Sequence, residues 1–82
     1  MTSRRLVVMP SIEVGMEEGR VIEYVVEVGS TVVVGQPLFV VEADKASVEV
    51  EAPTSGRVVE LSAELDADLP VGSTVLVLEE QL

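Results

Sequence analysis

Short apolar runs rich in valine recur along the whole chain and are separated by turn residues. Where apolar and charged side chains alternate, as in residues 48–51, the pattern is typical of a strand with one buried face. Gly, Pro, Ser and Asp stand between the runs at the spacing of a small barrel or sandwich. No window keeps a 3.6-residue period long enough for a helix. The pattern therefore predicts an all-β fold.

The second half of the chain repeats the first. Residues 19–42 align with residues 56–79 at a constant offset of 37 without a gap, and nine of the 24 positions are identical. Most of the other pairs exchange one apolar residue for another. Because the identical pairs include glycine, arginine and glutamate, a chance match between valine-rich strands is a poor explanation. The repeat therefore predicts two structurally similar halves.

A shorter match extends the repeat, since Val50–Pro53 resembles Val7–Pro10 at an offset of 43. Between the proline and the next Gly-Arg-Val, the first half has the eight-residue loop 11–18 and the second half only Thr54 and Ser55. Two similar halves commonly pack as a pseudo-twofold pair. We expect each half to supply one sheet, because neither sheet can bury its apolar face alone.

This symmetry has a geometric consequence for the segment that joins the halves. The offset of 37 pairs Lys45 with Leu82, the last residue of the chain. The joining turn should therefore lie at the end of the domain opposite to the termini. By the same argument, the long loop 11–18 should finish near that turn.

Length and composition exclude several classes of function. The 82 residues fit a single domain, 1–82, with its core at about residues 5–80. Without Cys or His there is no disulfide, no thiolate or imidazole metal site, and no Cys or Ser-His nucleophile. The net charge of −10 argues against nucleic acid and favours encounters with basic protein surfaces. We expect neither catalytic residues nor a metal site.

Targeting and membrane signals are also missing from the pattern. The longest apolar runs are a few residues long, against the ~20 that a membrane span needs. The apolar stretch after Arg4 and Arg5 meets Pro10 too soon for a signal peptide. Hydrophobic residues make up 48% of the chain, which argues against disorder. We expect a folded domain with no membrane contact and a cytoplasmic location, with which the lack of Cys is compatible.

Lys45 is the only lysine, so chemistry that needs a side-chain amine has one place to occur. Strand patterns end at Val41 and resume at Val48, and Asp44 before the lysine is a good turn residue. The lysine is thus predicted on a hairpin tip, where an enzyme could reach it. From position alone, a solvated surface lysine is an equally good interpretation.

Residues 42–46, Glu-Ala-Asp-Lys-Ala, followed by Val48–Pro53, resemble the modification segment of lipoyl domains, the swinging-arm modules of 2-oxo acid dehydrogenase complexes. The resemblance covers about residues 7–79. It implies a flattened barrel, or barrel-sandwich hybrid, of two four-stranded antiparallel sheets with the lipoyl lysine on an exposed hairpin. Further segments match the family in order: Met9–Ile12, Gly15–Gly19, Gly29–Val32, Gly35–Leu38 and Ser55-Gly56.

The resemblance implies that Lys45 accepts lipoic acid through an amide bond, added by a lipoate ligase or lipoyl transferase. The implied partners are a thiamine-diphosphate 2-oxo acid dehydrogenase, a dihydrolipoyl acyltransferase core and the flavin-dependent dihydrolipoyl dehydrogenase. The domain would carry acyl groups and reducing equivalents between them as a non-catalytic monomer. Tethering raises the effective concentration of the carried group at each partner.

Residues around Lys45 and in the long loop are candidates for recognition by these partners. Asp44 and Ala46 flank the lysine, and a turn role for Asp44 is compatible with recognition. Ala43 stands where the family commonly has Thr or Ser, so we expect this position to bear on which ligase or partner recognises the tip. For Glu42 a structural role is at least as good an explanation. The candidates are Glu13, Glu17, Glu18, Glu42, Ala43, Asp44 and Ala46. For the three glutamates of the long loop, a solvated acidic loop is an equally good interpretation.

A second departure from the family is Asp66-Ala67-Asp68, where the family usually has Gly-Asp. Because Asp tolerates the left-handed backbone region, we expect this turn to survive at some cost.

Two other functions remain open. A biotin carrier for a carboxylase shares the fold, but biotin carriers typically have Met on both sides of the lysine, unlike Asp44 and Ala46. An unmodified interaction domain of the same fold would show no modification even with an active ligase. Starting at Met1, the chain slightly favours a free-standing carrier over a domain excised from an acyltransferase.

Overall fold

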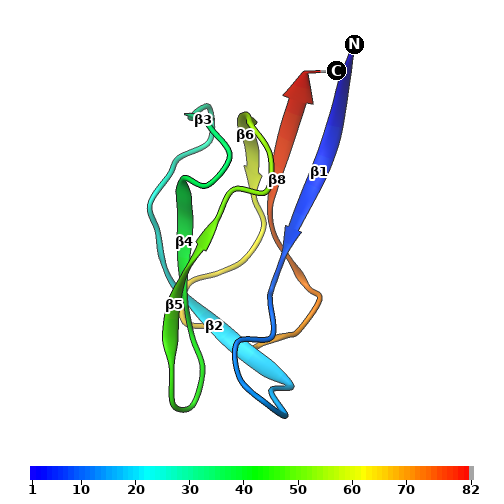
Figure 1. Cartoon of the computed structure of the whole chain (residues 1–82). Helices are drawn as coiled ribbons and strands as arrows, with labels where there is room; N and C mark the ends of the chain where they lie inside the picture. Colours follow the sequence, from blue (N-terminus) through cyan, green and yellow to red (C-terminus); the bar gives the residue numbers. More distant parts are fainter. Residues whose placement is uncertain (82) are drawn as a thin grey trace.

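The computed structural model describes residues 1–81, which form eight β-strands and no helix (Figure 1). No helix of this part of the chain could therefore cross a membrane. Leu82, the repeat partner of Lys45, lies outside the described residues. The strands are β1 (Thr2–Val8), β2 (Glu18–Tyr24), β3 (Thr31–Val32), β4 (Pro37–Glu42), β5 (Ser47–Glu51), β6 (Gly56–Leu61), β7 (Leu69–Pro70) and β8 (Thr74–Gln81).

The strands form two four-stranded sheets in which every pair is antiparallel. The strand orders are β1-β8-β6-β3 and β5-β4-β2-β7. The repeat relates β1 to β5, β2 to β6, β3 to β7 and β4 to β8, and this exchange converts the first order into the second. The flattened two-sheet fold and its internal pseudo-twofold symmetry are therefore confirmed.

The expectation that each half supplies one sheet is wrong. Each sheet takes its central pair from one half and its two edge strands from the other. Proline gives the physical reason, because Pro10 and Pro53 end β1 and β5 by lacking an N–H and fixing φ. After each proline the chain crosses to the other sheet. The two halves interlock and bury one shared core.

Equivalent irregularities occur in the two halves. The β2–β4 ladder is interrupted between Val21 and Glu23, and the β6–β8 ladder between Val58 and Glu60, which is the same break shifted by 37 residues. A β-bulge of this kind bends the strand and increases its twist. The repeat therefore extends to the bulges of the two central strand pairs.

Gly56 is fixed by the close approach of the neighbouring strand. A Cβ atom there would collide with the backbone oxygen of Glu79, so only glycine fits. Its repeat mate Gly19 faces the equivalent oxygen, that of Glu42, at 3.4 Å from an ideal Cβ, and also faces the Met16 side chain. Gly19 and Gly56 are thus close-packing positions between strands, whereas the other shared pair, Gly35 and Gly72, has positive φ and open space around it.

The core lies between the sheets and consists of aliphatic side chains around one aromatic pair. Phe39 and Met9 are completely buried, and the Tyr24 ring meets Phe39 edge-on with centroids 6.2 Å apart. The Tyr24 hydroxyl lies 2.9 Å from the carbonyl oxygen of Ala63 and 3.0 Å from that of Val75, and it accepts a hydrogen bond from the Ala63 N–H. Tyr24 therefore ties β2 to the opposite sheet.

The turn at Asp66 keeps the geometry of its glycine counterpart. Asp66 has φ 67°, and its repeat mate Gly29 has φ 96°. The N–H of Gly29 donates to the carbonyl of Val58, and the N–H of Asp66 donates to that of Val21, again with the offset of 37. The prediction that Asp tolerates the left-handed region at this turn is confirmed.

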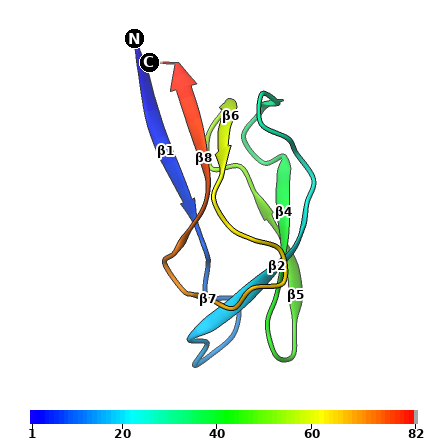
Figure 2. The same ribbon diagram turned by 180° about the vertical axis from the view of Figure 1, so that it is seen from behind.

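The chain ends and the joining turn lie at opposite poles of the molecule. Thr2 pairs with Gln81 across β1 and β8, so the termini are side by side. Figures 1 and 2 show the termini at one end and the β4–β5 turn at the other, seen from two opposite sides. The symmetry prediction about the joining turn is therefore confirmed.

Candidate functional site

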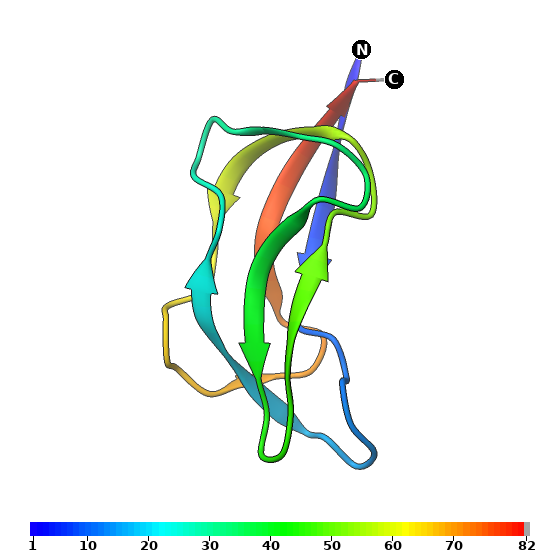
Figure 3. The same cartoon turned by 60° about the vertical axis from the view of Figure 1, so that its left-hand side comes forward.

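The site begins with the hairpin that joins the two halves. β4 ends at Glu42 and β5 starts at Ser47, and the N–H of Ala43 donates to the carbonyl of Ala46 at 2.8 Å. This bond leaves Asp44 and Lys45 as the two exposed residues of the tip, which projects beyond the sheets (Figure 3). The local sequence favours this turn because Asp suits a tight reversal and the valine pattern resumes immediately after it.

Lys45 makes no ion pair among residues 1–81, and Asp44 does not bind it. Its amine therefore faces solvent, and no group of the chain has to be displaced before another molecule reaches it. The small Ala46 beside it leaves room for an enclosing protein surface. Chemically, this is an accessible amine in a chain without His or Cys, suited to acylation by another enzyme rather than to catalysis.

Glu42 has a structural partner. Arg20 on the neighbouring strand donates to its carboxylate at 3.0 Å, and Arg57 lies 3.4 Å from the repeat mate Glu79. The Arg57–Glu79 pair lies at the pole that has no lysine. An arginine–glutamate pair is therefore part of the strand pairing that both halves share, and it does not depend on Lys45. Its stabilisation is small because both pairs are largely exposed. A recognition role for Glu42 stays a prediction.

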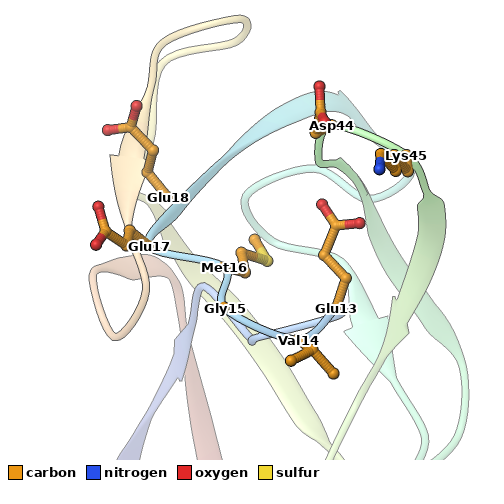
Figure 4. A pocket seen from close by; sticks show the side chains of 8 residues that line it. All are labelled: Glu13, Val14, Gly15, Met16, Glu17, Glu18, Asp44 and Lys45. Atoms are coloured by element: carbon orange, nitrogen blue, oxygen red, sulfur yellow. The ribbon is translucent and has the colours of Figure 1, made fainter.

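The long loop lies beside the tip, as the symmetry predicts. The loop and the tip line an open hollow of about 390 Å³ on the surface (Figure 4). Figure 4 shows the Glu13 carboxylate directed toward the tip and Met16 between the loop and the strands. The hollow is lined by Glu13, Val14, Gly15, Met16, Glu17, Glu18, Asp44 and Lys45.

Internal contacts hold the loop in place. The N–H of Met16 donates to the carbonyl of Glu13 at 3.2 Å, and the N–H of Ile12 lies 3.2 Å from the Met16 sulfur. Ile12 and Met16 also pack against the core. The turn they frame leaves Val14 fully exposed at the rim of the hollow. The loop is thus a fixed surface feature next to the lysine.

The structure divides the candidate recognition residues between two sides of the tip. Glu13, Glu17, Glu18 and Asp44 line the hollow with Lys45, so its lining carries four carboxylates and one cation. On the other side, a second depression brings the tip together with Arg20; it is lined by Arg20, Glu42, Ala43, Asp44, Lys45, Ala46 and Ser47.

Sequence reasoning missed three residues near the tip. From the sequence, Val14 is placed only within the long loop 11–18, Met16 only within the family segment Gly15–Gly19, and Arg20 only within the repeat. A signal for Arg20 did exist, because Arg20 and Glu42 recur at the same spacing as Arg57 and Glu79. No comparable pattern marks Val14, whose exposure depends on the loop conformation.

Comparison with known proteins supplies the family. The family model for biotin and lipoyl attachment, described as "Biotin-requiring enzyme", matches residues 5–78. Relatives named dihydrolipoyllysine-residue acetyltransferase component of pyruvate dehydrogenase complex occur in several bacteria. The chain is 39% identical to that of Mycobacterium bovis over 66 residues, 80% of this chain and 12% of the relative. For Haemophilus influenzae the identity is 42% over 67 residues, 82% of this chain and 12% of the relative.

A relative from Mycoplasma capricolum, with the same name, is 36% identical over 66 residues, which are 80% of this chain and 15% of that protein. The chain thus spans only about an eighth of the length of the relatives it matches. Their shared name refers to dihydrolipoyllysine, which favours lipoyl over biotin carriers. By the family match and this similarity, the chain belongs to the biotin and lipoyl attachment family and is a lipoyl domain.

Proposed function

We propose that Lys45 is the residue to which lipoic acid is joined, through an amide on its Nζ atom. The observation that carries this proposal is the position of the chain's only lysine, exposed on a hairpin tip at the pole opposite to the termini. A domain attached through either chain end would keep this tip clear of the attachment.

The residues around the tip fit such a group. The Lys45 amine has no ion-pair partner to lose among the described residues, and Ala46 offers no steric obstacle. When bound, a lipoyl group supplies a dithiolane that accepts acyl groups and electrons. Formation of the amide between lipoic acid and Lys45 also removes the charge of the lysine. The carboxylates that line the hollow are then left without a cation. The chain supplies position and surface for this chemistry.

The domain itself is proposed to be non-catalytic. An ammonium is not a nucleophile, and the chain has no His or Cys that could act as a base beside it. A lipoate ligase or lipoyl transferase must therefore deprotonate Lys45 in its own active site. The recognition flanks for such an enzyme are Asp44 and Ala46, which stand on both sides of the lysine.

We further propose that the domain serves a 2-oxo acid dehydrogenase complex, as the names of its relatives suggest. Its partners would be the thiamine-diphosphate component, the acyltransferase core and dihydrolipoyl dehydrogenase. The acidic hollow beside Lys45 suits active-site entrances with basic rims. Glu13, Glu17 and Glu18 are the proposed contacts of the loop. The cytoplasmic location expected from the sequence stays a prediction.

The direct test is intact mass after incubation with ATP, lipoic acid and a lipoate ligase, with biotin and a biotin ligase in parallel. We expect one lipoyl group per chain and no biotin. Biotin alone would assign the domain to a carboxylase. No addition from either ligase would favour an unmodified interaction domain, unless Ala43→Thr restores lipoylation, which would trace the failure to the missing hydroxyl at the tip.

A further inference from the structure

The middle of loop 11–18 has no backbone attachment to the sheets. Backbone hydrogen bonds tie Met9, just before the loop, and Glu17, near its end, to the segment 71–73. Between these anchors, none of the backbone hydrogen bonds of the described chain joins residues 10–16 to another segment. Side-chain packing therefore holds this part of the loop against the rest of the domain.

Met16 supplies much of this packing. Its terminal methyl group occupies the space that a side chain at position 19 would need, because the methyl carbon is 2.5 Å from an ideal Cβ atom on Gly19. Its sulfur lies 3.2 Å from the backbone nitrogen of Ile12 and accepts the hydrogen bond of that N–H. Both Met16 and Ile12 also pack against the core. One thioether thus connects the start of the loop to β2.

Met16 is also within reach of small molecules in solution. The chain has no Cys, so its three methionines contain all of its sulfur. Met9 is completely buried and Met1 is 92% exposed. Met16 is partly buried, and it lines the open hollow beside Lys45 (Figure 4). Met16 therefore combines a packing role with access from solvent, which Met9 lacks.

We propose that Met16 is a redox-sensitive modification site, and that its oxidation to the sulfoxide by a peroxide releases the middle of loop 11–18 from the sheets. In this step a lone pair of the sulfur attacks one oxygen of hydrogen peroxide, and the O–O bond breaks as the S–O bond forms. The sulfur gives up an electron pair. The second oxygen leaves as hydroxide and takes the proton of the first, which gives water. Methionine sulfoxide reductases reverse this modification.

The sulfoxide does not fit where the thioether packs. If the new oxygen takes the lone pair that faces Ile12, the 3.2 Å between sulfur and nitrogen leaves no room for it. On the other lone pair, the oxygen adds a polar atom to a side chain that packs against Gly19 and the core. A polar atom removed from water without a hydrogen-bond partner is unfavourable. Both epimers therefore favour a loop in which Met16 turns toward water.

Release of the loop changes the surface beside Lys45. Glu13 and Val14 line the hollow only while the loop keeps its position against the sheets. A protein that approaches the tip then meets a different surface in the reduced and the oxidised chain. This effect belongs to the loop and does not depend on what Lys45 carries.

Peptide mapping by mass spectrometry after treatment with hydrogen peroxide tests the first part of the proposal. The chain is used with Lys45 unmodified, so that methionine is its only source of sulfur. We expect one added oxygen on Met1 and one on Met16, whereas the buried Met9 stays unoxidised. Unreacted Met16 under conditions that oxidise Met1 would overturn the proposal.

Amide hydrogen exchange, measured by NMR before and after the treatment, tests the release of the loop. The N–H of Ile12 bonds to the Met16 sulfur, and the N–H of Met16 bonds to the carbonyl of Glu13. Both amides should exchange at least about tenfold faster in the oxidised chain. The reference is the amide of Ala43, which bonds within the hairpin on the other side of the hollow and should keep its rate.

The matched control is Met16→Leu, which keeps the volume of the side chain but has no sulfur to oxidise. Peroxide still oxidises Met1 in this variant, yet the exchange of its loop amides should be the same before and after treatment. Three results would overturn the proposal: oxidised Met16 with unchanged loop exchange, a variant that responds as the wild type does, or equally faster exchange at Ala43. None of these readouts involves the Lys45 amine, so the outcome is independent of the lipoylation test.

Discussion

At the scale of single residues, the repeat explains what several side chains do. Glu42 and Glu79 each face an arginine of the adjacent strand, so Glu42 is accounted for without reference to Lys45. The sequence could not settle this, because the two partners are 22 residues apart and meet only through a ladder with a bulge. Lys45 differs because its repeat position is the end of the chain, not another lysine.

Asp66 is expected to limit stability. It holds φ 67° where its repeat mate is a glycine, and a non-glycine residue in this region costs about 1 kcal/mol. Asp66→Gly should therefore raise the free energy of unfolding by about 0.5–1 kcal/mol, measured by urea denaturation. The reciprocal Gly29→Asp should lower it by a similar amount, since no atom lies within 4 Å of the new Cβ. If Asp66→Gly destabilises the protein, this interpretation of the turn is wrong.

Tyr24 links the sheets through a hydroxyl that is partly removed from water. Burial raises the pKa of Tyr24 above 10.0, and the hydrogen bond from the Ala63 backbone opposes that shift. Because the folded pKa lies above the unfolded value, the contribution to stability is complete below pH 10 and is lost as pH rises through the folded pKa.

The alkaline stability of wild type and Tyr24→Phe measures this contribution. The variant should lose about 1–3 kcal/mol at neutral pH, because the Ala63 N–H loses its acceptor. The difference between the two proteins should shrink above pH 10. Since Tyr24 is the only tyrosine, absorbance during the same titration gives its pKa directly. A difference that stays constant to the end of the titration would contradict the account.

At the scale of elements, the strands and turns follow from the alternation of valine runs with Gly, Pro and Asp. The assignment of strands to sheets does not follow from it. A strand buries the same face whether it pairs within its own half of the chain or with strands of the other half. The hydrophobic pattern therefore does not predict that β1 and β5 are exchanged between the sheets. The crossings of the chain between the sheets, after Pro10 and Pro53 and on both sides of β3 and β7, decide which strands are exchanged, and they are tertiary features.

Loop 11–18 shows a second limit at this scale. Symmetry predicts it near the tip, and the hollow beside Lys45 confirms this position. The exposure of Val14 and the partial burial of Met16 within the loop were not predictable. They depend on the contacts of Ile12 and Met16 with the core, and these have no counterpart in the shorter loop.

At the scale of the whole molecule, the position of the candidate site followed from symmetry. A gapless repeat of 37 residues, applied to a chain of 82, places the joining turn and the termini at opposite poles. The structure has this arrangement, and the paired ends Thr2 and Gln81 leave the tip unobstructed. Charge also distinguishes this pole, since carboxylates outnumber cations in the lining of the hollow beside Lys45. The molecule thus presents its one lysine side chain at the pole opposite to the termini.

The central claim is that Lys45 is the site of lipoylation, and intact mass spectrometry of two proteins tests it most directly. Wild type and Lys45→Arg are incubated with ATP, lipoic acid and a lipoate ligase under the same conditions. Arginine keeps the charge and the exposed tip but cannot form the amide, so we predict one lipoyl group on the wild type and none on the variant. A lipoyl group on Lys45→Arg, or none on the wild type, would contradict the account.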